Sequence, residues 1–286
     1  MVSSASYAVA KMIAFSTPNF RFIPWVNAAA TVREEIFKDM TVLVEARKKA
    51  MSTGEDVPDD CITAIINNDM TDEELSDHAC TLISAGHDTT AFFSSYVCLL
   101  LADNPEWQDK LRADIIAQVG DRNDITTDDI AQITLLHKVL EETLRLFAII
   151  PILTRVAATE VTIKDAASDT PGGALRDLTI PKGTDIMIPM YLLNRDPTVW
   201  ENASKFDPTR FEGHGDYTSA KSGFFPFGYG TRTCIGNTLA QIETSVFICH
   251  LLRRYRMKPT PGFKVDIIAG ISLTTSNGVS VTLEKL

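Results

Sequence analysis

Apolar residues recur with a helical period through the first half of the chain. Between Thr31 and Met51 they are spaced three or four residues apart, which predicts an amphipathic helix closed by a Ser-Thr-Gly stop. Thr71 followed by Glu74 is the sequence of a capping box and predicts the start of another helix. Since no breaker precedes Asn104, that helix is expected to run roughly 45 Å across the whole domain.

The pattern changes in the second half of the chain. Three further helices are predicted, at 105–120, 134–148 and 235–256. Between the last two, short β-branched runs predict strands at 160–163, 178–180 and 185–191. Near the end, two strand-like runs flank Asn277 and Gly278, which is a strong hairpin signal. The sequence therefore predicts a mainly α fold with small accessory β-sheets.

Composition excludes several classes of protein. Of the 286 residues, 45% are hydrophobic and 22% are charged, which is typical of soluble globular chains. The net charge of -10 argues against a nucleic-acid partner. The five cysteines form no CxxC pair, so neither a disulfide framework nor a zinc site is indicated, and a reducing compartment is the default. No apolar run approaches the roughly 18 residues that span a bilayer, so we expect the chain as written not to cross a membrane.

Cys234 stands between a turn-rich loop and a long amphipathic helix, in the stretch FFPFGYGTRTCIG (224–236). A lone cysteine is most often a small buried hydrophobe. A metal ligand must instead be a thiolate, and the first turn of a helix stabilises a thiolate through its unpaired N–H groups and positive dipole end. We expect Cys234 to lie in that first turn.

The residues around Cys234 suit a flat group that carries carboxylates. Arg232 supplies a cation for a carboxylate, and Phe227 supplies an apolar wall. Three glycines remove side chains and let the backbone approach closely, namely Gly228, Gly230 and Gly236. These are the requirements of a heme that is held through a cysteine.

The pattern F-x-x-G-x-R-x-C-x-G that these residues form resembles the heme-binding loop of the cytochrome P-450 family. The resemblance implies the P-450 fold and a heme b (iron protoporphyrin IX) bound through the Cys234 thiolate. It also implies a heme-thiolate monooxygenase that inserts one atom of O2 into an apolar substrate. Electrons would come from an NADPH-dependent reductase or a ferredoxin-type donor.

The stretch AGHDTT (85–90) places a glycine and two threonines beside an acid in the middle of the long helix. A mid-helix glycine costs about 1 kcal/mol relative to alanine, so a local use is indicated. The stretch resembles the family's oxygen-activation motif, in which the helix opens beside the heme. That resemblance implies that Ala85 and Gly86 border the heme and that Asp88 and Thr89 relay protons to the distal oxygen. The alternative is a bend in an ordinary helix.

Three charged residues match positions that support the heme pocket in this family. Glu142 and Arg145 form its E-x-x-R motif, and Arg210 in FDPTRF completes a triad with them. The resemblance implies that this group is buried and structural. Arg155 matches a second clamp on a heme propionate, its alternative being a charge at a strand edge.

We interpret 1–286 as one P-450 domain that is N-terminally truncated relative to complete family members. Residues 1–58 would precede the central long helix, and 59–286 would form the heme-binding core. Two alternatives to the monooxygenase remain. One is a non-catalytic fragment that cannot assemble a complete heme pocket. The other is a heme-thiolate isomerase or dehydratase, against which Asp88 and Thr89 argue because such enzymes need no proton relay for oxygen.

The partners expected are an electron donor and a small apolar substrate. Arg253, Arg254 and Arg256 would dock an acidic donor or simply complement the end of their helix. The stretch PNFRFIPW (18–25) is expected to be part of the pocket roof or a turn that contacts a membrane peripherally. The family implies an intracellular protein whose full-length parent is a candidate for the endoplasmic reticulum membrane, while the chain itself specifies no location.

Overall fold

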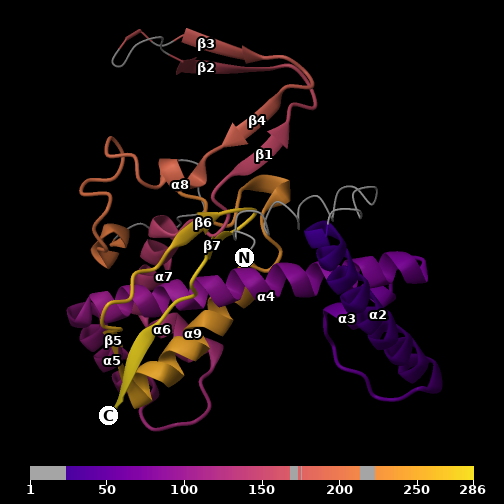
Figure 1. Ribbon diagram of the computed structural model, residues 1–286, viewed down its shortest axis with the longest axis horizontal. Helices are drawn as coiled ribbons and strands as arrows, with labels where there is room; N and C mark the ends of the chain where they lie inside the picture. Colours follow the sequence, from indigo (N-terminus) through magenta and orange to yellow (C-terminus); the bar gives the residue numbers. More distant parts are fainter. Residues whose placement is uncertain (1–23, 168–172, 175, 213–222) are drawn as a thin grey trace.

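The computed structural model describes residues 24–167, 173–174, 176–212 and 223–286, with side chains from residue 34 onward. A 32-residue helix, α4 (Asp72–Asp103), runs through the molecule, and most other helices pack on it (Figure 1). The predicted capping box is confirmed: the Thr71 N–H donates to Glu74 Oε2 at 2.8 Å, and the Glu74 N–H donates to Thr71 Oγ1 at 3.3 Å. Within the described residues, no helix combines the length and the apolar character of a membrane span.

The remaining helices follow the predicted order, with additions. The predicted first helix lies inside α2 (Pro24–Thr53), and the three later ones appear as α5 (Pro105–Val119), α7 (Thr134–Leu146) and α9 (Asn237–Arg254). The structure also contains short elements that the sequence did not predict. These are the helices α3 (Cys61–Ile66), α6 (Thr127–Gln132) and α8 (Met190–Leu193) and the 3-10 turns η2 (Pro208–Phe211) and η3 (Gly230–Arg232).

Four antiparallel strand pairs complete the described fold. Their bounds are β1 (Leu153–Val156) with β4 (Asp185–Ile188), β2 (Val161–Ala167) with β3 (Arg176–Ile180), β5 (Tyr255–Pro259) with β8 (Val281–Lys285), and β6 (Ile267–Ala269) with β7 (Leu273–Thr275). The β2–β3 hairpin projects away from the helices (Figure 1). A mainly α fold with small sheets is therefore confirmed.

The hairpin predicted at Asn277 and Gly278 is wrong. The strand before this turn pairs with β6, and the strand after it pairs with β5, which continues directly from α9. The Asn277 side chain explains the outcome: its Oδ1 accepts from the Asp266 N–H at 2.9 Å and its Nδ2 donates to the Lys264 carbonyl at 2.8 Å. These bonds fasten the turn to the chain before β6, so it does not close a hairpin.

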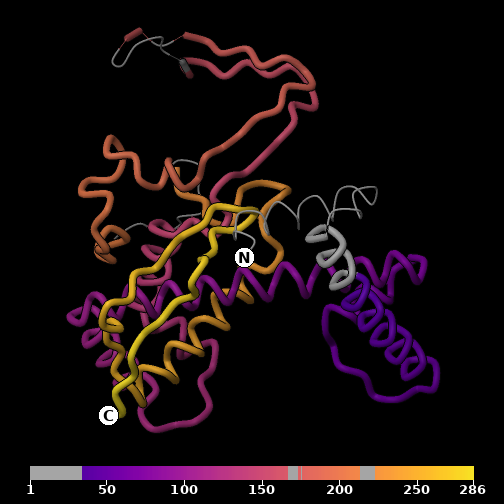
Figure 2. Tube along the Cα trace, in the orientation of Figure 1, coloured from indigo at the N-terminus to yellow at the C-terminus, as the bar shows by residue number. Residues whose placement is uncertain are grey.

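The buried side chains gather in two clusters along α4. The larger cluster surrounds the C-terminal half of α4, where α5, α7 and α9 pack around residues such as Tyr96 and Leu101. A small cluster of Val44, Leu75 and Ala79 lies where α2 and α3 meet the N-terminal half. Figure 2 shows α2 and α3 at one end of α4 and the C-terminal strands toward the other. Between the clusters, residues 83–88 of α4 are exposed.

Candidate functional site

The Cys234 loop ends before α9, so the prediction that Cys234 lies in the first helical turn is wrong. The N-cap of α9 is Gly236, and Cys234 precedes it by two residues. The 3-10 turn η3 and its C-cap Thr233 lie within this loop, directly before Cys234. The Cys234 N–H donates to the Phe227 carbonyl at 2.8 Å, which fixes the cysteine to the loop.

The sulfur nevertheless lies beside the start of the helix. A Cβ built on Gly236 would stand 3.9 Å from Cys234 Sγ, so the N-cap next to the sulfur carries no side chain. Cys234 itself is exposed. Gly228 and Gly230 have φ angles of 78° and 72°, in the left-handed region that side chains disfavour. The loop thus presents an exposed thiol next to glycine backbone, and half-buried Phe227 packs on the main core.

Arg155 and Arg232 line one hollow, although 77 positions separate them in the sequence. The hollow has a volume of about 470 Å³ and lies between the β1–β4 pair and the Cys234 loop. Arg155 Nη1 donates to its neighbour, the Thr154 carbonyl, at 2.8 Å. The complete lining is Thr154, Arg155, Val156, Asp185, Ile186, Met187 and Arg232, which does not include Cys234. Two cations around one space can bind a group with two carboxylates.

The AGHDTT stretch lies on the exposed middle of α4. The backbone stays helical from Asp72 to Asp103, whereas the resemblance implied that the helix opens here. The Thr89 hydroxyl donates to the Ala85 carbonyl at 2.6 Å, a bond within the helix that leaves the regular ladder in place. No atom comes within 4 Å of a Cβ added at Gly86, so Ala85 and Gly86 form a side-chain-poor surface.

The two polar residues of this stretch differ in exposure. The Asp88 side chain is 53% exposed, and His87 Nδ1 lies 3.1 Å from Asp88 Oδ1. Thr89 is half-buried. Asp88 and Thr89 are adjacent on the helix, so a carboxylate in contact with solvent stands next to a hydroxyl that points along the helix.

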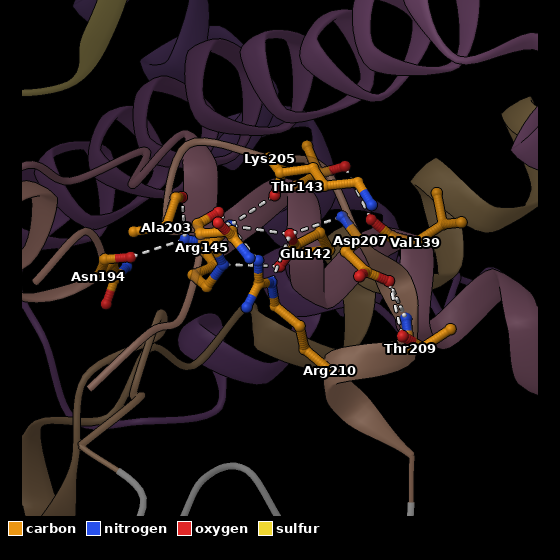
Figure 3. A network of polar contacts seen from close by, with 11 residues as sticks. Val139, Glu142, Thr143, Arg145, Asn194, Ala203, Lys205, Asp207, Thr209 and Arg210 are labelled. Carbon is orange, nitrogen blue, oxygen red and sulfur yellow. Dashed lines mark hydrogen bonds and ion pairs between the residues drawn. The ribbon is translucent and has the colours of Figure 1, made fainter. Parts of the chain in front are cut away.

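Glu142, Arg145 and Arg210 meet as the resemblance implied (Figure 3). Arg145 binds Glu142 through two nitrogens, and Arg210 Nε lies 3.4 Å from Glu142 Oε1. The Asp207 N–H also donates to Glu142 Oε1, at 2.9 Å. The predicted triad is therefore confirmed, with Glu142 and Arg145 buried and Arg210 half-buried.

Sequence reasoning missed the rest of this network. Arg145 donates to the carbonyls of Asn194, Ala203 and Lys205 at 2.9, 2.7 and 3.2 Å, and its guanidinium lies 5.3 Å from the centroid of the Trp200 ring. These contacts come from irregular chain between α8 and η2, where no periodicity marks a buried position. They join α7 to the segment that leads toward the Cys234 loop.

The arginines at the end of α9 and the start of β5 are partly engaged. Arg256 of β5 pairs with Asp109 of α5 at 2.5 Å, and Arg254 Nη1 of α9 lies 3.2 Å from His250 Nδ1. Docking of an acidic donor at these arginines stays a prediction. The membrane-contact prediction for 18–25 lies largely outside the described residues.

Comparison with known proteins gives a consistent result. The cytochrome P-450 family model matches residues 3–281. A cytokinin hydroxylase of Arabidopsis thaliana is 28% identical over 284 residues, which cover 94% of this chain and 52% of the relative. A taurochenodeoxycholic 6 alpha-hydroxylase of Sus scrofa is 33% identical over 220 residues (77% and 41%), and an 11-oxo-beta-amyrin 30-oxidase of Medicago truncatula is 27% identical over 271 residues (89% and 49%).

The chain spans about half the length of the curated relatives it matches. The family model nevertheless covers almost all of the sequence, including the Cys234 loop, the α4 stretch and the Glu142–Arg145–Arg210 triad. The chain belongs to the cytochrome P-450 family.

Proposed function

We propose that this chain provides the heme-thiolate portion of a monooxygenase that inserts one oxygen atom from O2 into a small apolar organic substrate. The observation that carries the proposal is the Cys234 loop, whose sulfur is exposed beside a bare helix start while Arg232 of the same loop shares a hollow with Arg155. The relatives named above are hydroxylases or an oxidase by name, which supports this reaction class.

The residues present fit a heme b. Cys234 would supply the thiolate ligand, while Gly228, Gly230 and Gly236 leave backbone against which a flat ring can lie. Phe227 would form the apolar wall, and the carboxylates would pair with Arg155 and Arg232. Ala85 and Gly86 would face the other side of the ring. When bound, the heme supplies the iron that activates dioxygen.

Asp88 and Thr89 would handle protons in this reaction. Asp88 is half exposed and therefore in contact with water, and Thr89 holds a proton at Oγ1 that now bonds the Ala85 carbonyl at 2.6 Å. A rotation of the Thr89 side chain would turn that proton toward the distal side of the site. Two adjacent groups of this kind act as a general-acid relay.

The electron donor is proposed to be an NADPH-dependent reductase or a ferredoxin-type protein, with no nucleic-acid partner. Location at the endoplasmic reticulum membrane stays a prediction. A second candidate is kept beside the monooxygenase, namely a non-catalytic portion of such an enzyme that would not close a heme pocket.

The test is a difference spectrum of the purified chain, reconstituted with hemin, reduced and exposed to carbon monoxide. Thiolate ligation gives a red-shifted Soret band, and we expect this band for the parent chain. Cys234→Ala should abolish it, whereas Cys249→Ala should retain it, because Cys249 is buried and its burial raises the pKa of the thiol to about 11.

The other outcomes decide between the two candidates. A chain that folds but takes up no hemin supports the non-catalytic portion. A spectrum typical of histidine ligation, or equal loss in both cysteine variants, overturns the assignment of Cys234.

A further inference from the structure

Ser94 of α4 and Thr244 of α9 form a hydrogen bond across the interface of the two helices that carry the proposed site. Their hydroxyl oxygens are 3.0 Å apart, and 150 positions separate them in the sequence. Ser94 is half-buried and Thr244 is 0% exposed. The bond therefore lies inside the packed contact between α4 and α9.

The surroundings of this bond are apolar. On α4, Phe93 and Val97 flank Ser94, and both are buried in the main core. On α9, Ile248 follows Thr244 by one helical turn and is also 0% exposed. Apolar contacts are non-directional, so they specify the register of two packed helices less sharply than a hydrogen bond does. Two hydroxyls in an apolar interface need each other as hydrogen-bond partners. They therefore favour the one register of α4 and α9 in which they meet.

The position of the bond connects it to the proposed site. Ser94 follows Thr89 by five residues, which is roughly 7.5 Å along α4. Thr244 follows the N-cap of α9 by eight residues, which is roughly 12 Å from the end of the helix where Cys234 lies. Because each helix moves as a rod over such distances, a slip at the contact would shift Cys234 relative to Thr89 by a similar amount.

We infer that Ser94 and Thr244 are positioning residues, which fix the distance between the Cys234 sulfur and the AGHDTT stretch of α4. Neither hydroxyl touches the residues proposed to bind heme or to move protons. This role rests on the proposed function, because it serves a reaction that needs groups from both helices. The geometric part, the contribution of this hydrogen bond to the register of α4 and α9, is measurable without heme.

The experiment measures the distance between spin labels on the two helices. One label is placed on Cys234 and the other on Ser84→Cys, an exposed position of α4, after Cys61→Ser and Cys80→Ser remove other accessible thiols. We expect one narrow distance distribution in this parent. In Ser94→Ala/Thr244→Val the distribution should shift or broaden by at least about 1.5 Å, the rise of one helical residue.

Two variants separate positioning from simple stability. Thr244→Ser keeps the hydroxyl and should restore the parent distribution. The double variant removes both partners together, so its melting temperature should stay close to that of the parent even though its distances change. Thr162→Val/Thr179→Val removes a matched pair of hydroxyls, also 3.0 Å apart, from the β2–β3 hairpin and should leave the distances unchanged.

An unchanged distribution in Ser94→Ala/Thr244→Val overturns the inference, as does an equal change in the hairpin control. The outcome is independent of the heme test, since these samples contain no heme. If the double variant alters the label distances but the chain takes up no hemin, the positioning role of Ser94 and Thr244 is supported and the proposed monooxygenase function is refuted. In chains that do take up hemin, the double variant should show less of the thiolate Soret band, and Thr244→Ser should recover it.

Discussion

Arg145 and Glu142 are joined by two hydrogen bonds inside the protein, Nε to Oε2 at 2.6 Å and Nη2 to Oε1 at 2.8 Å, with both side chains 0% exposed. Three backbone carbonyls accept the other Arg145 protons. A buried charge of this kind is tolerated only because its partners surround it. The pair fastens α7 to the chain that leads toward the Cys234 loop, so its loss should affect the whole core.

Glu142→Gln should lower the free energy of unfolding by about 3 to 5 kcal/mol, because it leaves the Arg145 charge buried without an anion. Urea denaturation followed by circular dichroism measures this loss. The matched control is Glu284→Gln, which removes an equivalent carboxylate from a pair with Lys258 in which both side chains are 54% exposed. The control should leave the unfolding midpoint nearly unchanged. Equal losses in the two variants would show that the buried pair adds no particular stability.

The sequence predicts local features of this fold well. The capping box at Thr71 and Glu74 sets the start of α4, and Asn104 with Pro105 sets its end, because these signals act over a few residues. The helix α3 escaped notice, since six residues hold too little periodicity and its N-cap bond from the Thr63 N–H to Asp60 depends on one side chain.

Long-range relationships were harder to predict. Arg155 was named as a clamp only through the family resemblance, and its position around one hollow with Arg232 follows from the folded arrangement of β1 and the loop. The pairing of β8 with β5 was missed because the Asn-Gly signal is local, whereas the bonds of Asn277 to Asp266 and Lys264 are not. The Ser94–Thr244 bond left no sequence signal, since isolated hydroxyls occur on many helices.

Glu141 should make the stability of the fold depend on pH near neutrality. Burial raises the pKa of Glu141 from 4.5 to about 8. Between these values the folded protein holds a proton that the unfolded chain has released, so stability falls as pH rises through the window. Glu141→Gln lacks the titrating carboxyl. As pH rises from about 4.5 to about 8, its free energy of unfolding should therefore increase relative to that of the parent, by at most about 1.4 kcal/mol per pH unit.

Denaturation series at about pH 5 and about pH 8 measure this difference. Glu284→Gln again serves as the control, since Lys258 lowers the pKa of the Glu284 carboxyl and its effect is confined to acid conditions. A constant difference between Glu141→Gln and the parent over the whole range would contradict the raised pKa of Glu141.

Arg155 and Arg232 should both contribute to hemin affinity. Each lines the hollow beside the Cys234 loop. A hydrogen-bonded pair of one arginine and one carboxylate raises binding affinity roughly tenfold. Arg155→Gln and Arg232→Gln are therefore expected to weaken binding by about tenfold each, as measured by absorbance titration with hemin. Lys182→Gln removes an exposed cation outside the hollow and should bind like the parent. If all three variants weaken binding alike, the two arginines act through net charge rather than through specific pairing.

Thr89→Ala should separate electron consumption from product formation without releasing heme. Thr89 holds a proton on a hydroxyl that bonds the Ala85 carbonyl at 2.6 Å, and Thr89 is not among the residues proposed to ligate the heme or to pair with its carboxylates. Loss of that proton donor should divert reducing equivalents into hydrogen peroxide. The measurement is the amount of hydrogen peroxide formed for each NADPH consumed, which should rise. Thr81→Ala is the matched control, because the Thr81 hydroxyl makes the same kind of bond to the Asp77 carbonyl at 2.8 Å on the same helix. If Thr89→Ala forms no more peroxide per NADPH than the parent, or if both variants form equally more, Thr89 is not part of the proton relay. Its hydroxyl would then serve only the hydrogen bond within α4.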